Sequence, residues 1–131
     1  MERIQEDREE ADDLLGHAET HLRSAKKLLG EDPEGAYQLL YDAARKATAA
    51  DMLAQGYRAK SDQPGAHATV VLYAEEALAQ VADGEALANF DRMRRSRNRT
   101  EYGSMTVGSS QVEADLEHAR AIVEAVRQRL R

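Results

Sequence analysis

The stretch of sequence that decides the fold is residues 36–53, AYQLLYDAARKATAADML. Apolar residues recur in it every three or four positions, which is the spacing of one face of an α-helix. That face, which continues beyond the stretch to Ala54 and Tyr57, is made mainly of alanine and leucine: Ala36, Leu39, Leu40, Ala43, Ala47, Ala50 and Leu53. Because alanine side chains are short, neighbouring helices can approach this face closely. The stretch therefore predicts a helix that packs tightly against its neighbours.

The same spacing continues outward from this segment in both directions, and nowhere do apolar residues alternate as they do in a strand. The five predicted helices span about residues 4–29, 33–57, 67–81, 84–102 and 112–130. Gly30 closes the first helix, and Asp32 followed by Pro33 starts the second. The sequence thus predicts one all-α domain over residues 1–131, an up-and-down bundle of four main antiparallel helices plus one shorter helix.

Composition limits the class of protein. The chain has no cysteine, which excludes a disulfide framework and thiolate zinc sites. Its net charge is -6, so any binding to nucleic acid has to come from a local patch. The N-terminal residues hold no apolar run that could serve as a signal or a membrane span. We therefore expect a cytoplasmic protein with no membrane segment and no cofactor.

Charge is segregated along the chain. Seven acidic residues lie between Glu2 and Asp13, whereas five arginines lie within the eight residues from Arg92 to Arg99. An acidic first turn favours a helix N-terminus, and both stretches are compatible with solvated surface. The alternative interpretation is that the arginine cluster is a functional basic patch.

Arg97 is the member of this cluster that the helical pattern directs inward. The apolar stripe of the fourth helix consists of Leu87, Phe90 and Met93, and Arg97 continues it. The adjacent row, expected to remain in water as ordinary surface, consists of Arg92, Arg95 and Arg99. An inward arginine is costly unless it is paired. Candidate partners are Glu101, Asp51, the acids of a second copy, or a bound anion.

Other polar residues complete the candidate site. Asn98 and Tyr102 are four residues apart on the flank of the stripe, so an amide, a phenol and a guanidinium converge at the helix end. Such a group can hold a phosphate or a nucleobase. His67 opens the third helix and reaches Arg97 if the two helices pack together. His17 and His21 have ligand spacing, but no third ligand is evident, so no metal site is predicted.

The segment from Arg94 to Tyr102, RRSRNRTEY, resembles the motif region of the HEPN superfamily. The resemblance extends to the central helix quoted above, to a Pro-Gly loop, and to the following segment HATVVLYAEEAL at residues 67–78. Members of that superfamily are small helical bundles, usually dimeric. Many are metal-independent ribonucleases that act as toxins or defence effectors, often paired with a nucleotidyltransferase antitoxin. In such members an arginine, commonly followed by asparagine, precedes a histidine by four to six intervening residues.

Carried over by residue, the resemblance assigns the motif arginine to Arg97 and the polar residue after it to Asn98. Tyr102 stands where the family has histidine. Three functions follow as hypotheses. The first is a homodimeric module that binds RNA, a nucleotide or a cognate nucleotidyltransferase through Arg95, Arg97, Asn98, Arg99 and Tyr102. The second is a metal-independent ribonuclease that uses Arg97 with Tyr102 or His67. The third is a non-catalytic structural or interaction bundle.

Overall fold

The computed structural model describes residues 1–60, 65–101 and 107–131, with the side chains of residues 100 and 101 excepted. The described part contains five helices: α1 (Arg8–Leu28), α2 (Pro33–Gln55), α3 (Ala66–Ala77), α4 (Gly84–Glu101) and α5 (Ser109–Arg129). Two short strands, β1 (Glu2–Arg3) and β2 (Tyr57–Arg58), form an antiparallel pair. The predicted all-α class is therefore confirmed. None of these helices is both long enough and apolar enough to cross a membrane.

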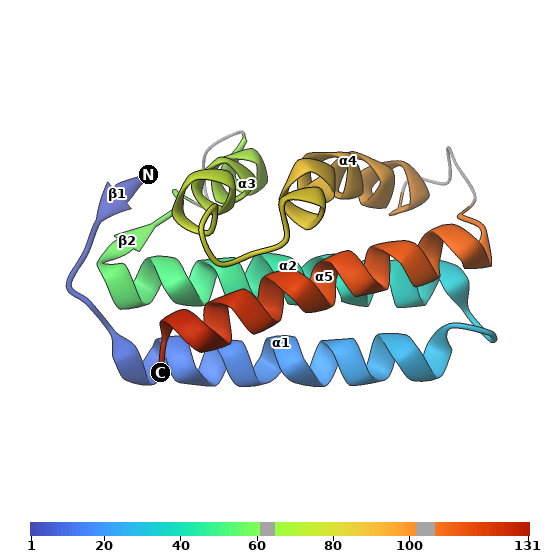
Figure 1. Cartoon of the computed structure of the whole chain (residues 1–131), viewed down its shortest axis with the longest axis horizontal. Helices are drawn as coiled ribbons and strands as arrows, with labels where there is room; N and C mark the ends of the chain where they lie inside the picture. Colours follow the sequence, from blue (N-terminus) through green and yellow to red (C-terminus); the bar gives the residue numbers. More distant parts are fainter. Residues whose placement is uncertain (61–64, 102–106) are drawn as a thin grey trace.

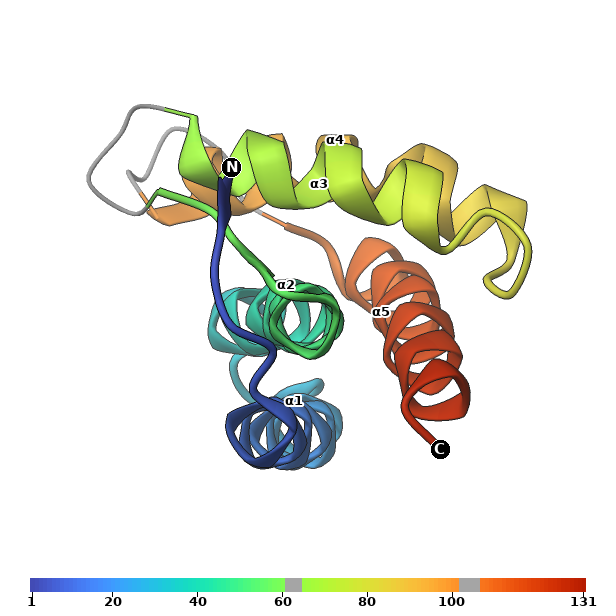
Figure 2. The same ribbon diagram turned by 90° about the vertical axis from the view of Figure 1, so that its left-hand side faces the viewer.

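The helices form two layers rather than one set of parallel rods. Figure 1 shows α1 running antiparallel to both α2 and α5, which lie above it in that view. Figure 2 looks along these three helices and shows α3 and α4 lying across the top of α2 and α5. The predicted antiparallel packing therefore holds for α1 with α2 and for α1 with α5. It is wrong for α2 and α5, which run in the same direction, and for α3 and α4, which pack across them.

The N-terminal boundary of the first helix differs from the prediction. Its start is set by Asp7, whose carboxylate accepts a hydrogen bond from the backbone N–H of Glu10 at 2.9 Å. The residues before it pair instead with the segment that follows α2, and the N–H of Ile4 donates to the carbonyl of Gly56. Gly56 has φ +86°, a left-handed conformation that ends α2 before Tyr57. Helical spacing predicted that the first helix begins at about residue 4, and it did not predict the short strand that precedes the helix.

The alanine-rich face of α2 is the centre of the core. Its alanines are buried against α1 and α5, as close packing of short side chains requires: Ala36, Ala43, Ala44, Ala47 and Ala50. Larger side chains fill the space under α3 and α4, among them Tyr41, Phe90 and Met93. The tight packing predicted from residues 36–53 is confirmed.

Two buried aspartates hold the upper layer to the lower one. Asp115 of α5 accepts from the hydroxyl of Tyr37 at 2.6 Å and from both terminal nitrogens of Arg92 at 3.1 and 2.5 Å. Asp51 of α2 accepts in the same way from Tyr73 at 2.7 Å and from Arg129 at 2.8 and 3.1 Å. Each carboxylate is fully buried, and bidentate pairing with arginine offsets its desolvation.

These two contacts correct two predictions. Arg92 was expected to be an ordinary surface residue, but it reaches across to α5 because Asp115 is buried there. Asp51 was a candidate partner for Arg97, but its oxygens are engaged by Tyr73 and Arg129.

Candidate functional site

The candidate site lies where the N-terminus of α3 and the C-terminal half of α4 meet α2, and it is built around the ring of Tyr41. This ring is fully buried, and it packs against Phe90 with 6.1 Å between ring centroids. The guanidinium carbon of Arg97 lies 5.7 Å from the Tyr41 centroid, a cation–π geometry. The imidazole of His67 approaches the same ring from α3, with centroids 6.0 Å apart. One tyrosine thus brings Arg97 and His67 together.

Arg97 is half-buried, in agreement with the inward direction predicted for it. Its backbone carbonyl accepts from the side-chain amide of Gln38 at 3.4 Å, which fixes this turn of α4 to α2. Its guanidinium also donates to the side-chain oxygen of Asn98 at 3.4 Å. The predicted grouping of Arg97 with Asn98 is therefore present. Ser96, the residue before Arg97, is more deeply buried than either of them.

Further arginines gather around the same point. The guanidinium groups of Arg45, Arg94 and Arg97 all lower the pKa of the Tyr41 phenol, but burial outweighs them and raises it to about 12. Arg45 lies 3.5 Å from Asp42, and Arg94 lies 2.9 Å from Asp91. Arg95 and Arg99 are exposed beside them, and Arg95 also pairs with Asp91 at 3.2 Å. The result is a basic surface on an acidic protein.

The surroundings of His67 favour its neutral form. Burial lowers the pKa of its imidazole, and the positive charges of Arg45 and Arg97 lower it further. Its Nδ1 lies 3.5 Å from the hydroxyl of Tyr41. A neutral imidazole beside guanidinium groups can accept a proton from a hydroxyl group that those arginines help to position.

Other predicted residues take different places. Tyr102 and the side chain of Glu101 lie outside the described residues. His21 does not join His17 at a metal, since its Nε2 accepts from the ammonium of Lys46 at 2.7 Å. Nowhere in residues 1–60, 65–101 and 107–131 do three histidine or carboxylate side chains come together as a metal site would require.

Sequence reasoning missed Tyr41 and Arg45. The signal was present, because Tyr37, Tyr41 and Arg45 are spaced four apart and share one face of α2. Only the packing of α4 on that face shows that the row contacts the arginine cluster.

No protein-family model matches the chain, and no curated protein matches it.

Proposed function

We propose that this chain is a HEPN-like RNA-binding module that holds a backbone phosphate of single-stranded RNA at Arg97. The observation that carries this proposal is the placement of the Arg97 guanidinium over the Tyr41 ring, beside His67. The cation–π contact holds the guanidinium at this point, and its N–H groups lie in one plane suited to two phosphate oxygens. Because the site is half-buried, the attraction is screened less than on an open surface.

Single-stranded RNA fits this site better than a DNA duplex does. The overall charge of -6 opposes extended contact with a duplex, whereas the basic surface around Arg94, Arg97 and Arg99 is confined to one end of α4. Specific recognition of RNA generally uses single strands, whose bases stack on aromatic or guanidinium planes. The proposal therefore concerns a few nucleotides of a loop or a free end.

The test measures fluorescence anisotropy of a labelled single-stranded RNA at several salt concentrations. Arg97→Ala is expected to weaken binding and to make the slope of log affinity against log salt shallower by about 0.7, the share of one phosphate contact on a single strand. The matched control is Arg23→Ala on α1, an exposed arginine that donates to the hydroxyl of Thr20 and lies in the other layer. Equal effects of the two substitutions, or no binding by the unaltered chain, would overturn the proposal.

The pairing of Arg97 with a neutral His67 favours a second candidate, metal-independent RNA cleavage. His67 would accept the proton of a 2′-hydroxyl, the 2′-oxygen would attack the adjacent phosphorus, and the 5′-oxygen would leave and take up a proton. The products are a 2′,3′-cyclic phosphate and a 5′-hydroxyl end. Arg97 would stabilise the charge that develops on the phosphate oxygens. No metal ion takes part in this scheme.

Cleavage is tested with purified chain in excess EDTA, by gel analysis of RNA products. His67→Gln is expected to abolish cleavage, because an amide cannot accept the proton of the 2′-hydroxyl, and to lower RNA affinity less than Arg97→Ala does. Arg97→Ala is expected to reduce both cleavage and affinity. If the chain binds RNA but does not cleave it, RNA binding is its function and the cleavage hypothesis is wrong.

The resemblance to the HEPN superfamily adds three elements to the proposal: a homodimer, a nucleotidyltransferase partner, and a role in a toxin–antitoxin or defence system. Light scattering of the purified chain tests the dimer, and co-purification with a nucleotidyltransferase encoded beside it tests the partner. If Arg97→Ala changes neither RNA binding nor cleavage but disrupts the dimer, the non-catalytic interaction bundle is the correct alternative.

A further inference from the structure

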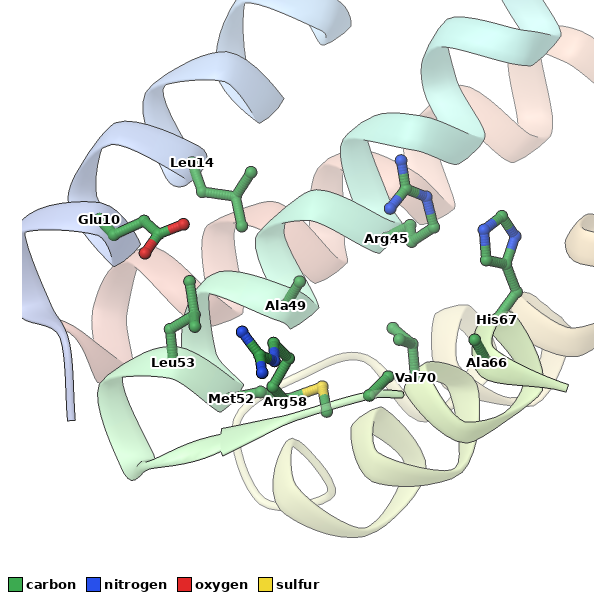
Figure 3. A pocket seen from close by; sticks show the side chains of 11 residues that line it. Glu10, Leu14, Arg45, Ala49, Met52, Leu53, Arg58, Ala66, His67 and Val70 are labelled. Carbon is green, nitrogen blue, oxygen red and sulfur yellow. The ribbon is translucent and has the colours of Figure 1, made fainter. Parts of the chain in front are cut away.

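A pocket of about 290 Å³ opens between α1, α2, β2 and α3, next to the site around Tyr41 (Figure 3). Its walls are apolar, with Leu14 from α1, Ala49 and Met52 from α2, and Val70 from α3. Arg45 and His67 lie together at one end of it, and Glu10 lies at the opposite end (Figure 3). The pocket is therefore an apolar slot with polar groups at both ends, and its size is near the lower limit for small-molecule sites.

The pocket adjoins the proposed phosphate site. His67 lines the pocket and also contacts the Tyr41 ring on which Arg97 lies. Arg45 likewise lines the pocket, and its charge acts on both Tyr41 and His67. A ligand whose anionic group lies near Arg97 can therefore extend a second group past His67 into the slot.

Arg45 offers a hydrogen-bond donor at this end of the slot. Its Nε is buried and makes no hydrogen bond to any residue of the described part, since the oxygen of Asp42 is 3.5 Å away. A buried donor of this kind costs free energy until a ligand accepts from it. An anionic or carbonyl oxygen at the mouth of the slot would satisfy it.

We propose that this pocket is a nucleobase subsite, which receives an unstacked base of the RNA whose phosphate lies between Arg45 and Arg97. The inference rests on the proposed function and specifies how that site engages its ligand. A base has apolar faces that match the walls formed by Leu14, Met52 and Val70, and the Met52 sulfur is suited to contact with an aromatic ring. Its polar edge would face the carboxylate of Glu10, a hydrogen-bond acceptor.

A fatty carboxylate is the main competing occupant, since it has an apolar body and an anionic head for Arg45. Its terminal methyl group would then face the carboxylate of Glu10 and would offer it no hydrogen bond. A base supplies that hydrogen bond. Because Glu10 accepts hydrogen bonds, a base with an exocyclic amino group fits better than uracil, which has none.

The test is calorimetric titration of the full chain with four probes: adenosine monophosphate, uridine monophosphate, ribose 5-phosphate and octanoate. We expect adenosine monophosphate to bind most tightly, uridine monophosphate more weakly, and ribose 5-phosphate at least about tenfold more weakly than adenosine monophosphate, because it lacks the base. Binding of octanoate alone, or equal binding of ribose 5-phosphate and adenosine monophosphate, would overturn the inference.

Filling the slot provides the structural control. Ala49→Leu places a larger side chain in the pocket wall and is expected to reduce affinity for adenosine monophosphate at least about tenfold. Ala88→Leu, at an exposed position of α4, is the matched substitution and should leave that affinity unchanged. If Ala49→Leu does not fold, Ala66→Leu narrows the same pocket from α3.

The outcomes separate this inference from the proposed function. If Arg97→Ala weakens RNA binding while Ala49→Leu changes neither RNA nor mononucleotide affinity, the proposed function stands and the base subsite is wrong. If Ala49→Leu weakens mononucleotide binding but the unaltered chain does not bind RNA, the RNA-binding function and the RNA base subsite are both wrong, and the pocket is a mononucleotide site. Loss of both ligands in Ala49→Leu, with the fold retained, supports both.

Discussion

Arg92 and Arg97 lie on the same helix, five positions apart, and each meets a tyrosine of α2, yet their surroundings differ. Arg92 makes a bidentate pair with the buried carboxylate of Asp115, which Tyr37 also contacts. Arg97 lies over the ring face of Tyr41, with the neutral imidazole of His67 on the same ring. The first arrangement joins its arginine to a buried carboxylate of another helix. The second places its guanidinium over an aromatic ring, at the surface that we propose as the ligand site.

The buried carboxylate of Asp115 gives Arg92 a structural role, and Arg97 remains the candidate for a functional one. A carboxylate that pairs with two guanidinium nitrogens occupies the edge of N–H donors at which a phosphate would bind. On α4, Arg92, nearer the start of the helix, pairs with α5, whereas Arg97, nearer the end, lies over Tyr41 and is the candidate for ligand binding. Both roles arise from the same residue type in the same helical pattern.

The largest expected effect comes from removing the anion of the first arrangement. Asp115→Ala leaves Arg92 half-buried and leaves the hydroxyl of Tyr37 buried without its acceptor, so we expect a loss of about 3–5 kcal/mol in the free energy of unfolding. Urea denaturation followed by circular dichroism measures it. Glu117→Ala, an exposed position two residues away on α5, is the control and should change stability by less than about 0.5 kcal/mol. A cost no greater than the control would mean that Asp115 does not hold the layers together.

The same substitution at both arginines sharpens the comparison. Arg92→Met leaves the carboxylate of Asp115 buried without its cation, and we expect a cost of about 3 kcal/mol. Arg97→Met removes a cation–π contact worth about 0.5–1 kcal/mol and adds apolar surface over Tyr41, so stability should change by no more than about 1 kcal/mol. Thermal and urea unfolding of the two variants side by side provide the measurement. Equal losses would contradict the difference that we draw between them.

The smallest expected effect is on the pH dependence of stability. The pKa of His67 is below its ordinary value of 6.5 in the folded chain, so between these two values the unfolded chain binds more protons than the folded one. Stability should therefore fall as the pH decreases through 6.5, and His67→Gln should make that decrease smaller. His21 has a lowered pKa through burial and the charge of Lys46, and His21→Gln should act in the same direction. Unfolding midpoints at several pH values from 5 to 8 test this, and an unchanged pH dependence in both variants would contradict it.

Much of the fold could be predicted from local patterns. The spacing of Ala36, Leu40, Ala43, Ala47 and Ala50 predicted the buried face of α2, and the Asp32-Pro33 signal predicted its first turn correctly. The pairing of β1 with β2 could not be predicted this way, because it joins residues 2–3 with residues 57–58 and leaves no periodic pattern in such short segments. The crossing of α3 and α4 over the lower layer depends on packing that a helical stripe does not specify.

The candidate site was predicted in part. Helical phase indicated that Arg97 faces inward, and the structure places it half-buried against α2. His67 was expected to reach the Arg97 region if α3 and α4 packed together, and the Tyr41 ring is the surface on which the two meet. Arg92 and Asp51 were assigned wrongly. Each has a partner on another helix, 23 residues away for Arg92 and 78 for Asp51.

The sequence by itself determined the helices and their buried faces, because helix formation and amphipathic spacing act over a few neighbouring residues. It also determined that the positive charge is concentrated near the end of α4. Only the tertiary structure decided that Arg92 meets the buried carboxylate of Asp115 and that Arg97 lies over the ring of Tyr41. That choice depends on residues brought together from α2, α3 and α5, and the cost of burying a charge is settled by those partners rather than by the neighbours of each arginine along the chain.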